Sequence, residues 1–442
     1  MNLINIVKDL SRSTLVKFGF LYTLANGIQK GIGFLAFMYL AMILTVSDYA
    51  TFGKYYALFA VISAASYAGI VELAISELSK HNTIKRRNSL FRLSNTLFSI
   101  LAFISVLIVL SIKYLAFNNW IFSDILIVCC GSVLSTFFLL QSQLIRLNEE
   151  HKASISLSFL PQISGYIAGL VLVFVLRTPQ SFFLGAIAGY LIAITLYLHP
   201  RFVFFGISKN LFSIKKSIKR WPPYLAIAFL SWLLGYGIVY VIDFFFTNDE
   251  IAIYVFLYTI SSIIQLVGTS MNQVWSPRFF NDFNFKDVPR LEQEYGRFTL
   301  IQGITLGFVG SVLLLLLPTL GLISNSYTIY TDKGFNLIWL FMGYIVAIPW
   351  WHVQNYYLVN NRGYELMRVT VSAGILGLLA WFLLMKALGV AGIYFGFFIN
   401  SLIRSGLVFI SAKKYWNIEF DLSGQFMGIL LLIGTIIIIS GI

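Results

Sequence analysis

Two apolar stretches, separated by one basic residue, decide the class of fold. Residues 153–176 read ASISLSFLPQISGYIAGLVLVFVL, and after Arg177 residues 178–200 read TPQSFFLGAIAGYLIAITLYLHP. Neither stretch contains a residue that is formally charged at neutral pH. Each is as long as the roughly 20 residues that an α-helix needs to cross the hydrocarbon core of a bilayer. Because backbone polar groups in lipid must be paired within their own segment, we expect both stretches to be membrane-spanning helices.

The same pattern recurs along almost the whole chain of 442 residues, of which 58% are hydrophobic and 11% are charged. A soluble domain would carry about 25% charged residues, so the composition excludes one. We therefore expect an all-α polytopic membrane protein with about 12 transmembrane helices and a short thirteenth apolar segment. The apolar stretches cover residues 17–42, 48–79, 93–117, 122–147, 153–176, 180–203, 222–246, 250–276, 297–323, 334–359, 366–387, 389–412 and 424–441.

Basic residues fall on alternate connections between these stretches. Of the 31 Lys and Arg residues, 24 lie on one set of connections and five on the other, which leaves Lys30 and Arg404. Cytoplasmic loops carry the excess of Lys and Arg in membrane proteins, so we expect the N-terminus to be cytoplasmic. This topology explains the net charge of +13 without a nucleic-acid surface. A nucleic-acid or partner-binding patch is the alternative interpretation of the basic residues in the 201–220 connection.

The longest basic connection divides the chain into two halves. We expect an N-terminal lobe of six helices (1–203), a cytoplasmic linker (204–221), a C-terminal lobe of six helices (222–412) and a tail with a short apolar segment (413–442). A weak internal repeat supports this division, since the stretch 48–52 resembles the stretch 250–254 and both open the second helix of their half. Duplicated bundles are a common plan of transporters, with the substrate path between the halves.

No motif for hydrolysis, group transfer or phosphate binding occurs in the sequence. The four histidines are scattered, and the two cysteines, Cys129 and Cys130, are adjacent within an apolar stretch. We therefore expect neither enzymatic activity nor a cofactor nor a metal site. Because a nucleotide site is missing as well, the chain is expected to act as a facilitator or an ion-coupled exchanger.

The first charge inside a hydrophobic segment is Lys30, near the middle of the first apolar stretch. Asn26 and Gln29 share its helical face, because residues three and four apart lie on the same side of a helix. A polar, cationic stripe in a membrane helix should face a bundle interior or a water-filled cavity. These three residues are therefore candidates for substrate binding. A structural ion pair of Lys30 with Glu72 or Asp243 is the alternative.

The second such charge is Arg404, eight residues before the end of its apolar stretch at residue 412. That spacing places it roughly 12 Å from the end of the helix, close to the middle of a core about 30 Å thick. Asn400, one turn earlier, extends the same face. Lys30 and Arg404 together would recognise phosphate oxygens through a point charge and a planar fork of donors. Packing of Arg404 against a helix C-terminus is the alternative.

The acidic candidates are Glu72, in the second apolar stretch, and Asp243, near the end of the seventh. Either can take up a proton or a sodium ion during transport, and either can equally be a counter-charge for Lys30. Gln265 and Asn272 supply neutral hydrogen-bonding groups, which suit the hydroxyl groups of a sugar.

Several short pieces of sequence, taken in order, resemble a known family along nearly the whole chain. They are Ser47-Asp48-Tyr49-Ala50, Arg146-Leu147-Asn148-Glu149, Pro222-Pro223, Asp243, Ala252-Ile253-Tyr254, Trp275-Ser276-Pro277 and Leu388-Gly389-Val390-Ala391-Gly392. With these pieces the chain resembles the bacterial O-antigen and capsule repeat-unit flippases of the multidrug/oligosaccharidyl-lipid/polysaccharide exporter superfamily. Members of that family commonly have an Arg after the Asp of the seventh helix, where this chain has Phe244, and this departure weakens a carried-over role for Asp243.

The resemblance implies a twelve-helix, two-lobed fold with a V-shaped central cavity and an alternating-access mechanism. It implies an undecaprenyl-pyrophosphate-linked oligosaccharide as the substrate, moved from the cytoplasmic to the periplasmic leaflet of the bacterial inner membrane. A polysaccharide polymerase and a chain-length regulator are the partners expected on the same basis. Two alternatives stay open: a multidrug exporter of organic cations, for which an acidic cavity would be favoured, and a non-transporting membrane scaffold for polysaccharide assembly.

Overall fold

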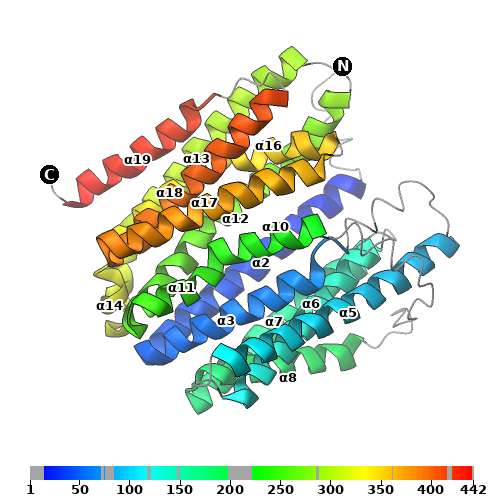
Figure 1. Ribbon diagram of the computed structural model, residues 1–442. Helices are drawn as coiled ribbons and strands as arrows, with labels where there is room; N and C mark the ends of the chain where they lie inside the picture. Colours follow the sequence, from blue (N-terminus) through cyan, green and yellow to red (C-terminus); the bar gives the residue numbers. More distant parts are fainter. Residues whose placement is uncertain are drawn as a thin grey trace. The chain divides into compact units, whose positions relative to one another are not determined.

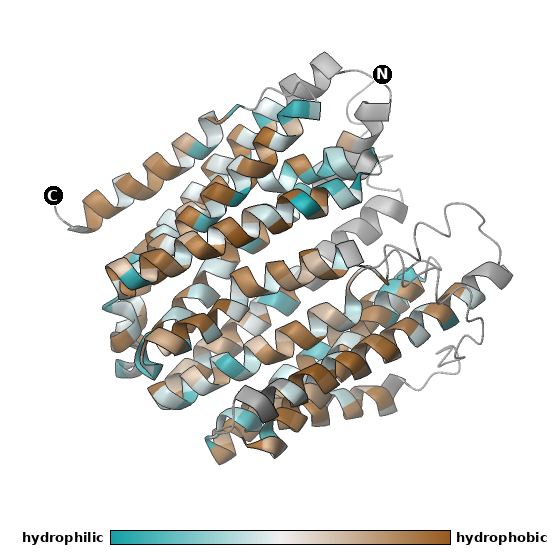
Figure 2. Ribbon diagram, viewed as in Figure 1, coloured by the Kyte–Doolittle hydropathy of each residue, from teal (hydrophilic) through white to brown (hydrophobic). Residues whose placement is uncertain are grey.

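The computed structural model describes residues 14–70, 74, 84–116, 121–146, 150–197, 222–284, 288–360, 362–415 and 421–440. Every regular element within these ranges is a helix. Ten helices in the described part of the chain are long and apolar enough to cross a membrane, and two shorter apolar helices accompany them at Gly27–Ile43 and Pro179–Thr195. The expected all-α membrane fold is therefore confirmed. Figure 2 shows apolar residues along most of the length of these helices.

The chain folds as two compact units, Met1–Trp232 and Leu233–Ile442. The first unit contains seven helices in the described residues (Figure 1). They are α2 (Thr14–Ile43), α3 (Val46–Tyr67), α5 (Ile84–Ala116), α6 (Phe122–Arg146), α7 (His151–Leu176), α8 (Pro179–Tyr197) and α10 (Pro222–Trp232).

The two stretches that surround Arg177 form a tight helical hairpin of α7 and α8. Arg177 turns the chain in the left-handed conformation, with φ of 52°, and its backbone N–H donates to the carbonyl of Val173 over 2.7 Å. The helices approach closely because α8 presents glycines: a β-carbon at Gly189 would collide with the carbonyl of Ser164 on α7. The Ser164 hydroxyl in turn donates to the Gly189 carbonyl over 3.0 Å. Small residues at the contact are what membrane helices use to pack tightly.

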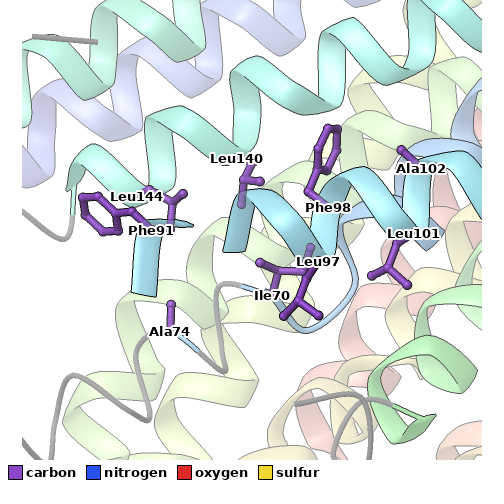
Figure 3. Packing of buried hydrophobic residues seen from close by; sticks show 9 residues of the cluster. All are labelled: Ile70, Ala74, Phe91, Leu97, Phe98, Leu101, Ala102, Leu140 and Leu144. Atoms are coloured by element: carbon purple, nitrogen blue, oxygen red, sulfur yellow. The ribbon is translucent and has the colours of Figure 1, made fainter. Parts of the chain in front are cut away.

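Helix α6 is joined to three neighbours in the first unit by buried apolar packing and by polar bonds. Its residues Leu140 and Leu144, one turn apart, pack against α5 in the apolar cluster drawn in Figure 3. Polar side chains add cross-links, since Gln141 Nε2 donates to Asn95 Oδ1 on α5 over 2.8 Å. Further bonds join Thr136 to Ser63 on α3 and Gln162 on α7 to Ser135. Satisfied polar groups of this kind hold membrane helices in one register.

The second unit is built from longer helices and a few short turns. Its elements are η1 (Leu233–Gly237), α11 (Ile238–Phe245), α12 (Asn248–Asn284), α13 (Val288–Ile323), η2 (Asn325–Tyr327), α14 (Thr328–Thr331), η3 (Gly334–Asn336), α15 (Leu337–Val346), α16 (Ile348–Val359), α17 (Gly363–Leu388), α18 (Val390–Tyr415) and α19 (Ser423–Ser440). Like the α7–α8 hairpin, α17 and α18 pack closely and turn at a left-handed residue, Gly389, with φ of 59°.

The boundary between the compact units lies inside the seventh apolar stretch, between Trp232 and Leu233, and the expected linker 204–221 lies outside the described residues. Helix α10 packs on α3, and the Trp232 indole N–H donates to the Ala57 carbonyl over 2.7 Å. The helix then breaks in the π-helical turn η1, where Gly235 has non-helical backbone angles. The first half of the seventh stretch therefore belongs to the N-terminal unit because its contacts are made there.

The thirteenth apolar segment forms a full helix, α19, within the second unit. It has 18 residues, the length and composition of a candidate membrane span, and it packs along α13. Glycines on both helices allow the approach: a β-carbon at Gly303 would collide with Gly424, and one at Gly307 would lie 2.6 Å from the Gly428 backbone. At about 1.5 Å per residue the helix is about 27 Å long, close to the thickness of the hydrocarbon core.

Candidate functional site

Lys30 lies in the body of α2, where its side chain is exposed on the surface of the first unit. It makes no ion pair or hydrogen bond with any residue that the structure describes. The glycines beside it, Gly27 and Gly31, have open space where a β-carbon would point, while Gly33 packs against the Tyr166 ring of α7. Among the described residues, no neighbour therefore covers α2 at Gly27 and Gly31, and the Lys30 side chain is exposed.

The two amides expected beside Lys30 differ in what the structure shows of them. Gln29 is partly buried on α2, next to Lys30. The side chain of Asn26 lies outside the described residues. Glu72, expected as a coupling residue or a counter-charge, also lies outside them.

Arg404 lies near the middle of α18, 14 residues after its start at Val390 and 11 before its end at Tyr415. The side chain is partly buried, and its Nε is sealed from solvent without a hydrogen-bond partner. Its guanidinium carbon lies 4.2 Å from the centre of the Trp350 ring on α16, in a cation–π contact. No carboxylate pairs with Arg404 among the described residues. The described part of the chain thus holds a mid-membrane guanidinium against an aromatic face instead of an acid.

A second aromatic residue lies within electrostatic range of the same cation. It is Tyr258, on α12, and its ring is buried. Asn400, expected on the face of Arg404, is buried against α17 instead, where its side-chain oxygen occupies the space that a β-carbon on Gly377 would need. Asn400 therefore joins α18 to α17, and the aromatic ring that contacts Arg404 is Trp350 of α16.

The remaining candidates of the second unit differ in how far their side chains are exposed. Asp243 is partly buried near the end of α11, and Gln265 is exposed on α12. Asn272 also lies on α12, where its Nδ2 donates to the Trp351 carbonyl over 3.3 Å. That bond ties α12 to α16, so one end of the Asn272 amide has a structural role. Of the two cations, Lys30 belongs to the first unit and Arg404 to the second.

Two consecutive buried hydrogen bonds, which the sequence did not predict, join three helices of the second unit. Gln302 Nε2, on α13, donates to the Gly268 carbonyl on α12 over 3.0 Å. This bond turns Gln302 Oε1 toward Nε2 of His352 on α16, 2.8 Å away, so the histidine Nε2 carries the hydrogen. The rings of Trp275, Tyr295 and Phe298 enclose His352, which is 1% exposed. In the sequence His352 is only one of four scattered histidines. Its partner Gln302 is 50 residues away, so no local pattern joins the two.

A buried carboxylate was missed in the first unit for the same reason. Asp124 lies in the first turn of α6 and is 6% exposed. The Tyr55 hydroxyl, on α3, donates to its Oδ2 over 3.0 Å. This hydrogen bond joins α6 to α3, and the helix dipole stabilises the carboxylate at the N-terminus of α6. In the sequence Asp124 lies at the edge of an apolar stretch, where acidic residues commonly mark the N-terminus of a helix.

The fold of the chain is shared with transporters of known structure. The lipid II flippase MurJ, in an inward closed conformation, matches over 96% of this chain and 99% of its own, with a TM-score of 0.67 and 13% sequence identity. The inward-facing multidrug resistance MATE family transporter of the MOP superfamily matches over 88% and 94%, with a TM-score of 0.63 and 12% identity. The eukaryotic MATE transporter AtDTX14 matches over 95% and 97%, with a TM-score of 0.54 and 13% identity.

Comparison at the level of sequence gives the family. No curated protein matches the chain closely enough to count as a relative. The family model described as "Polysaccharide biosynthesis protein" matches residues 15–282, from the first helix through α12. That range is well over half of the 442 residues, so the chain belongs to the polysaccharide biosynthesis protein family.

Proposed function

We propose that this protein is a flippase for an undecaprenyl-pyrophosphate-linked oligosaccharide, the repeat unit of an O-antigen or capsule. It moves this lipid from the cytoplasmic to the periplasmic leaflet of a bacterial inner membrane by alternating access, with its N-terminus in the cytoplasm. The observation that carries the proposal is the pair of cations within membrane helices, Lys30 and Arg404, neither of which has a carboxylate partner among the described residues.

The chemistry of such a substrate explains why two unpaired cations would be retained. A pyrophosphate cannot cross hydrocarbon unshielded, because an ion without a partner in a medium of low dielectric constant carries a large desolvation cost. Lys30 supplies a compact point charge, and Arg404 supplies a planar fork that matches phosphate oxygens. The polyprenyl tail can stay in lipid, and Gln29, Asn26, Gln265 and Asn272 are the amides that we expect to bind sugar hydroxyls.

Energy coupling forms the second part of the proposal. The sequence contains no nucleotide-binding motif, so a proton or sodium gradient is the expected source of energy, with Asp243 or Glu72 taking up the ion. The protein then works without a cofactor and catalyses no covalent step. A polysaccharide polymerase and a chain-length regulator would use the product on the periplasmic side.

A multidrug exporter has the same fold, as the MATE neighbours show, and it is the competing function. Organic cations would be bound by acidic groups, whereas the unpaired charges described in this chain are basic. A non-transporting scaffold would have no use for an unpaired charge in mid-membrane, because each such charge costs stability.

Complementation of a strain that lacks the native flippase tests the proposal. Lys30→Ala and Arg404→Ala should each reduce surface polysaccharide on a blot, with unchanged protein in the membrane. Lys386→Ala and Arg368→Ala, which remove exposed basic residues of α17, are the matched controls and should display normally. Normal display by both the Lys30 and the Arg404 variant would rule out their role. Raised drug resistance with unchanged polysaccharide would support the exporter instead.

A further inference from the structure

The contact between Arg404 and Trp350 has no carboxylate in it. Trp350 is buried, with 6% of its surface exposed, and the guanidinium carbon lies 4.2 Å above the centre of its ring. The face of an aromatic ring carries negative potential, and it attracts a cation more strongly when the pair is removed from water. The contact therefore offsets part of the cost of holding Arg404 in the middle of α18.

An indole and a carboxylate cover different parts of a guanidinium group. A carboxylate binds the N–H edge of arginine with two parallel hydrogen bonds, and it neutralises the charge. An aromatic ring covers only the flat face, and the N–H groups in the guanidinium plane stay available for oxygen atoms. Among the described residues, an anion that binds Arg404 against Trp350 has no acid to displace.

Snorkelling does not explain the position of Arg404 equally well. Its Cα lies eight residues before the end of the apolar stretch at residue 412, or roughly 12 Å at 1.5 Å per residue. An arginine side chain covers only part of that distance. The sealed Nε agrees with this, because a side chain directed along the helix toward water would expose it.

Trp350 lies in the first turn of α16, just after the break between α15 and α16. The helix is interrupted at Ala347, and Pro349 stands in the first turn of α16, where its missing N–H is tolerated. The next residue, Trp351, packs its indole against Gly268, where a β-carbon would collide with the ring. The Trp351 carbonyl accepts a hydrogen bond from Asn272 over 3.3 Å. These contacts tie the residue next to Trp350 to α12 and so fix the backbone from which the Trp350 ring extends.

We infer that Trp350 is a positioning residue for Arg404: it takes the place of a counter-ion, holds the guanidinium plane and leaves the terminal Nη groups free for the anionic group of the substrate. This inference rests on the proposed function, since it names the group through which Arg404 is prepared for a pyrophosphate. It also explains why an arginine is suited to this position, because a lysine has no flat face to stack.

A double-mutant cycle tests the inference with farnesyl pyrophosphate as the probe and purified protein in nanodiscs. Trp350→Leu keeps an apolar side chain but removes the ring, and Trp350→Phe keeps a ring. We expect Trp350→Leu to weaken binding about 3- to 30-fold, the range that a cation–π contact of this burial represents, and Trp350→Phe to restore most of the loss. In the Arg404→Leu background, Trp350→Leu should have no further effect.

Two controls separate positioning from stability. Trp381→Leu removes another fully buried indole of the same unit, one that contacts Phe397 rather than Arg404. It should lower the unfolding temperature without coupling to Arg404→Leu. Farnesol, which lacks the anionic group, should bind all the variants equally.

The outcomes distinguish a failure of the positioning role from a failure of the proposed function. If Arg404→Leu weakens binding and Trp350→Leu does not, the positioning role is overturned and the proposed function stands. The positioning role is likewise overturned, with the proposed function intact, if Trp350→Leu weakens binding equally in both backgrounds. If Arg404→Leu binds the probe as the wild type does, the role of Arg404 in the proposed function fails, and the inference fails with it.

Discussion

Replacing Gly307 by alanine should loosen α19 from α13, because the two backbones approach too closely for a side chain. A β-carbon at Gly307 would lie 2.6 Å from the Gly428 Cα and carbonyl oxygen, whereas ordinary van der Waals contact begins at 3.4 Å. The helices must therefore separate by about 0.8 Å at this point, and a gap of that size loses a quarter to a half of the local dispersion attraction.

The expected cost follows from the kind of contact. Gly428 also lies against Gly303 on the reciprocal side, so the strain cannot be relieved by moving a flexible side chain. Inserting a methyl group into a tightly packed contact costs about 1–3 kcal/mol. Gly434, on α19, has no atom within 4 Å of its β-carbon position in the described structure, and it supplies the matched control. Gly434→Ala should be neutral or add up to about 1 kcal/mol, because alanine favours a helix over glycine.

Reversible unfolding in mixed micelles, followed by tryptophan fluorescence, measures the free energy of each variant. Gly307→Ala should unfold at lower denaturant than the wild type, and Gly434→Ala at the same or a higher concentration. Equal stability of the two variants would refute the close approach of α13 and α19.

Three further predictions follow from single contacts. Arg177→Gly should keep or raise stability by about 1 kcal/mol, whereas Arg177→Val should lower it, because only glycine adopts φ of 52° without strain; thermal unfolding of both variants checks this. Gln302→Leu should cost about 1–3 kcal/mol in denaturant unfolding by leaving His352 Nε2–H unpaired, and adding His352→Phe should recover part of it; no recovery would contradict the hydrogen bond. Hydrogen bonds from Ser423 lower the pKa of Asp421 at the start of α19, so this cap stabilises the helix above pH 3.8 and is lost as the pH falls below that value. Hydrogen exchange of the first turn of α19 should accordingly differ between wild type and Asp421→Ala at pH 7 and become equal in acid.

The positions of the two cations could be predicted from the sequence, because a charged residue is rare in an apolar stretch. Counting residues places Lys30 and Arg404 deep in their helices, and the structure finds both in helix bodies. Their surroundings were not readable. The expected neighbour Asn400 packs against α17, and the ring that contacts Arg404, Trp350, is 54 positions earlier in the chain.

The sequence also does not show which helices the segment after residue 222 contacts. The basic run before residue 222 marks a cytoplasmic connection, and it predicts where a helix begins. It carries no information about which helices that segment contacts. The bond from Trp232 to Ala57, across 175 positions, assigns α10 to the first unit.

The sequence by itself determined the class of the protein, because membrane insertion depends on local quantities. The length and hydropathy of each stretch and the charge of each connection are sums over neighbouring residues, and they specify helices that cross a bilayer. The tertiary structure decided which polar groups meet, as in Arg404 over Trp350 and Gln302 between Gly268 and His352. Such pairs join separate helices, and in lipid their choice depends on close packing and hydrogen-bond geometry, which no local pattern encodes.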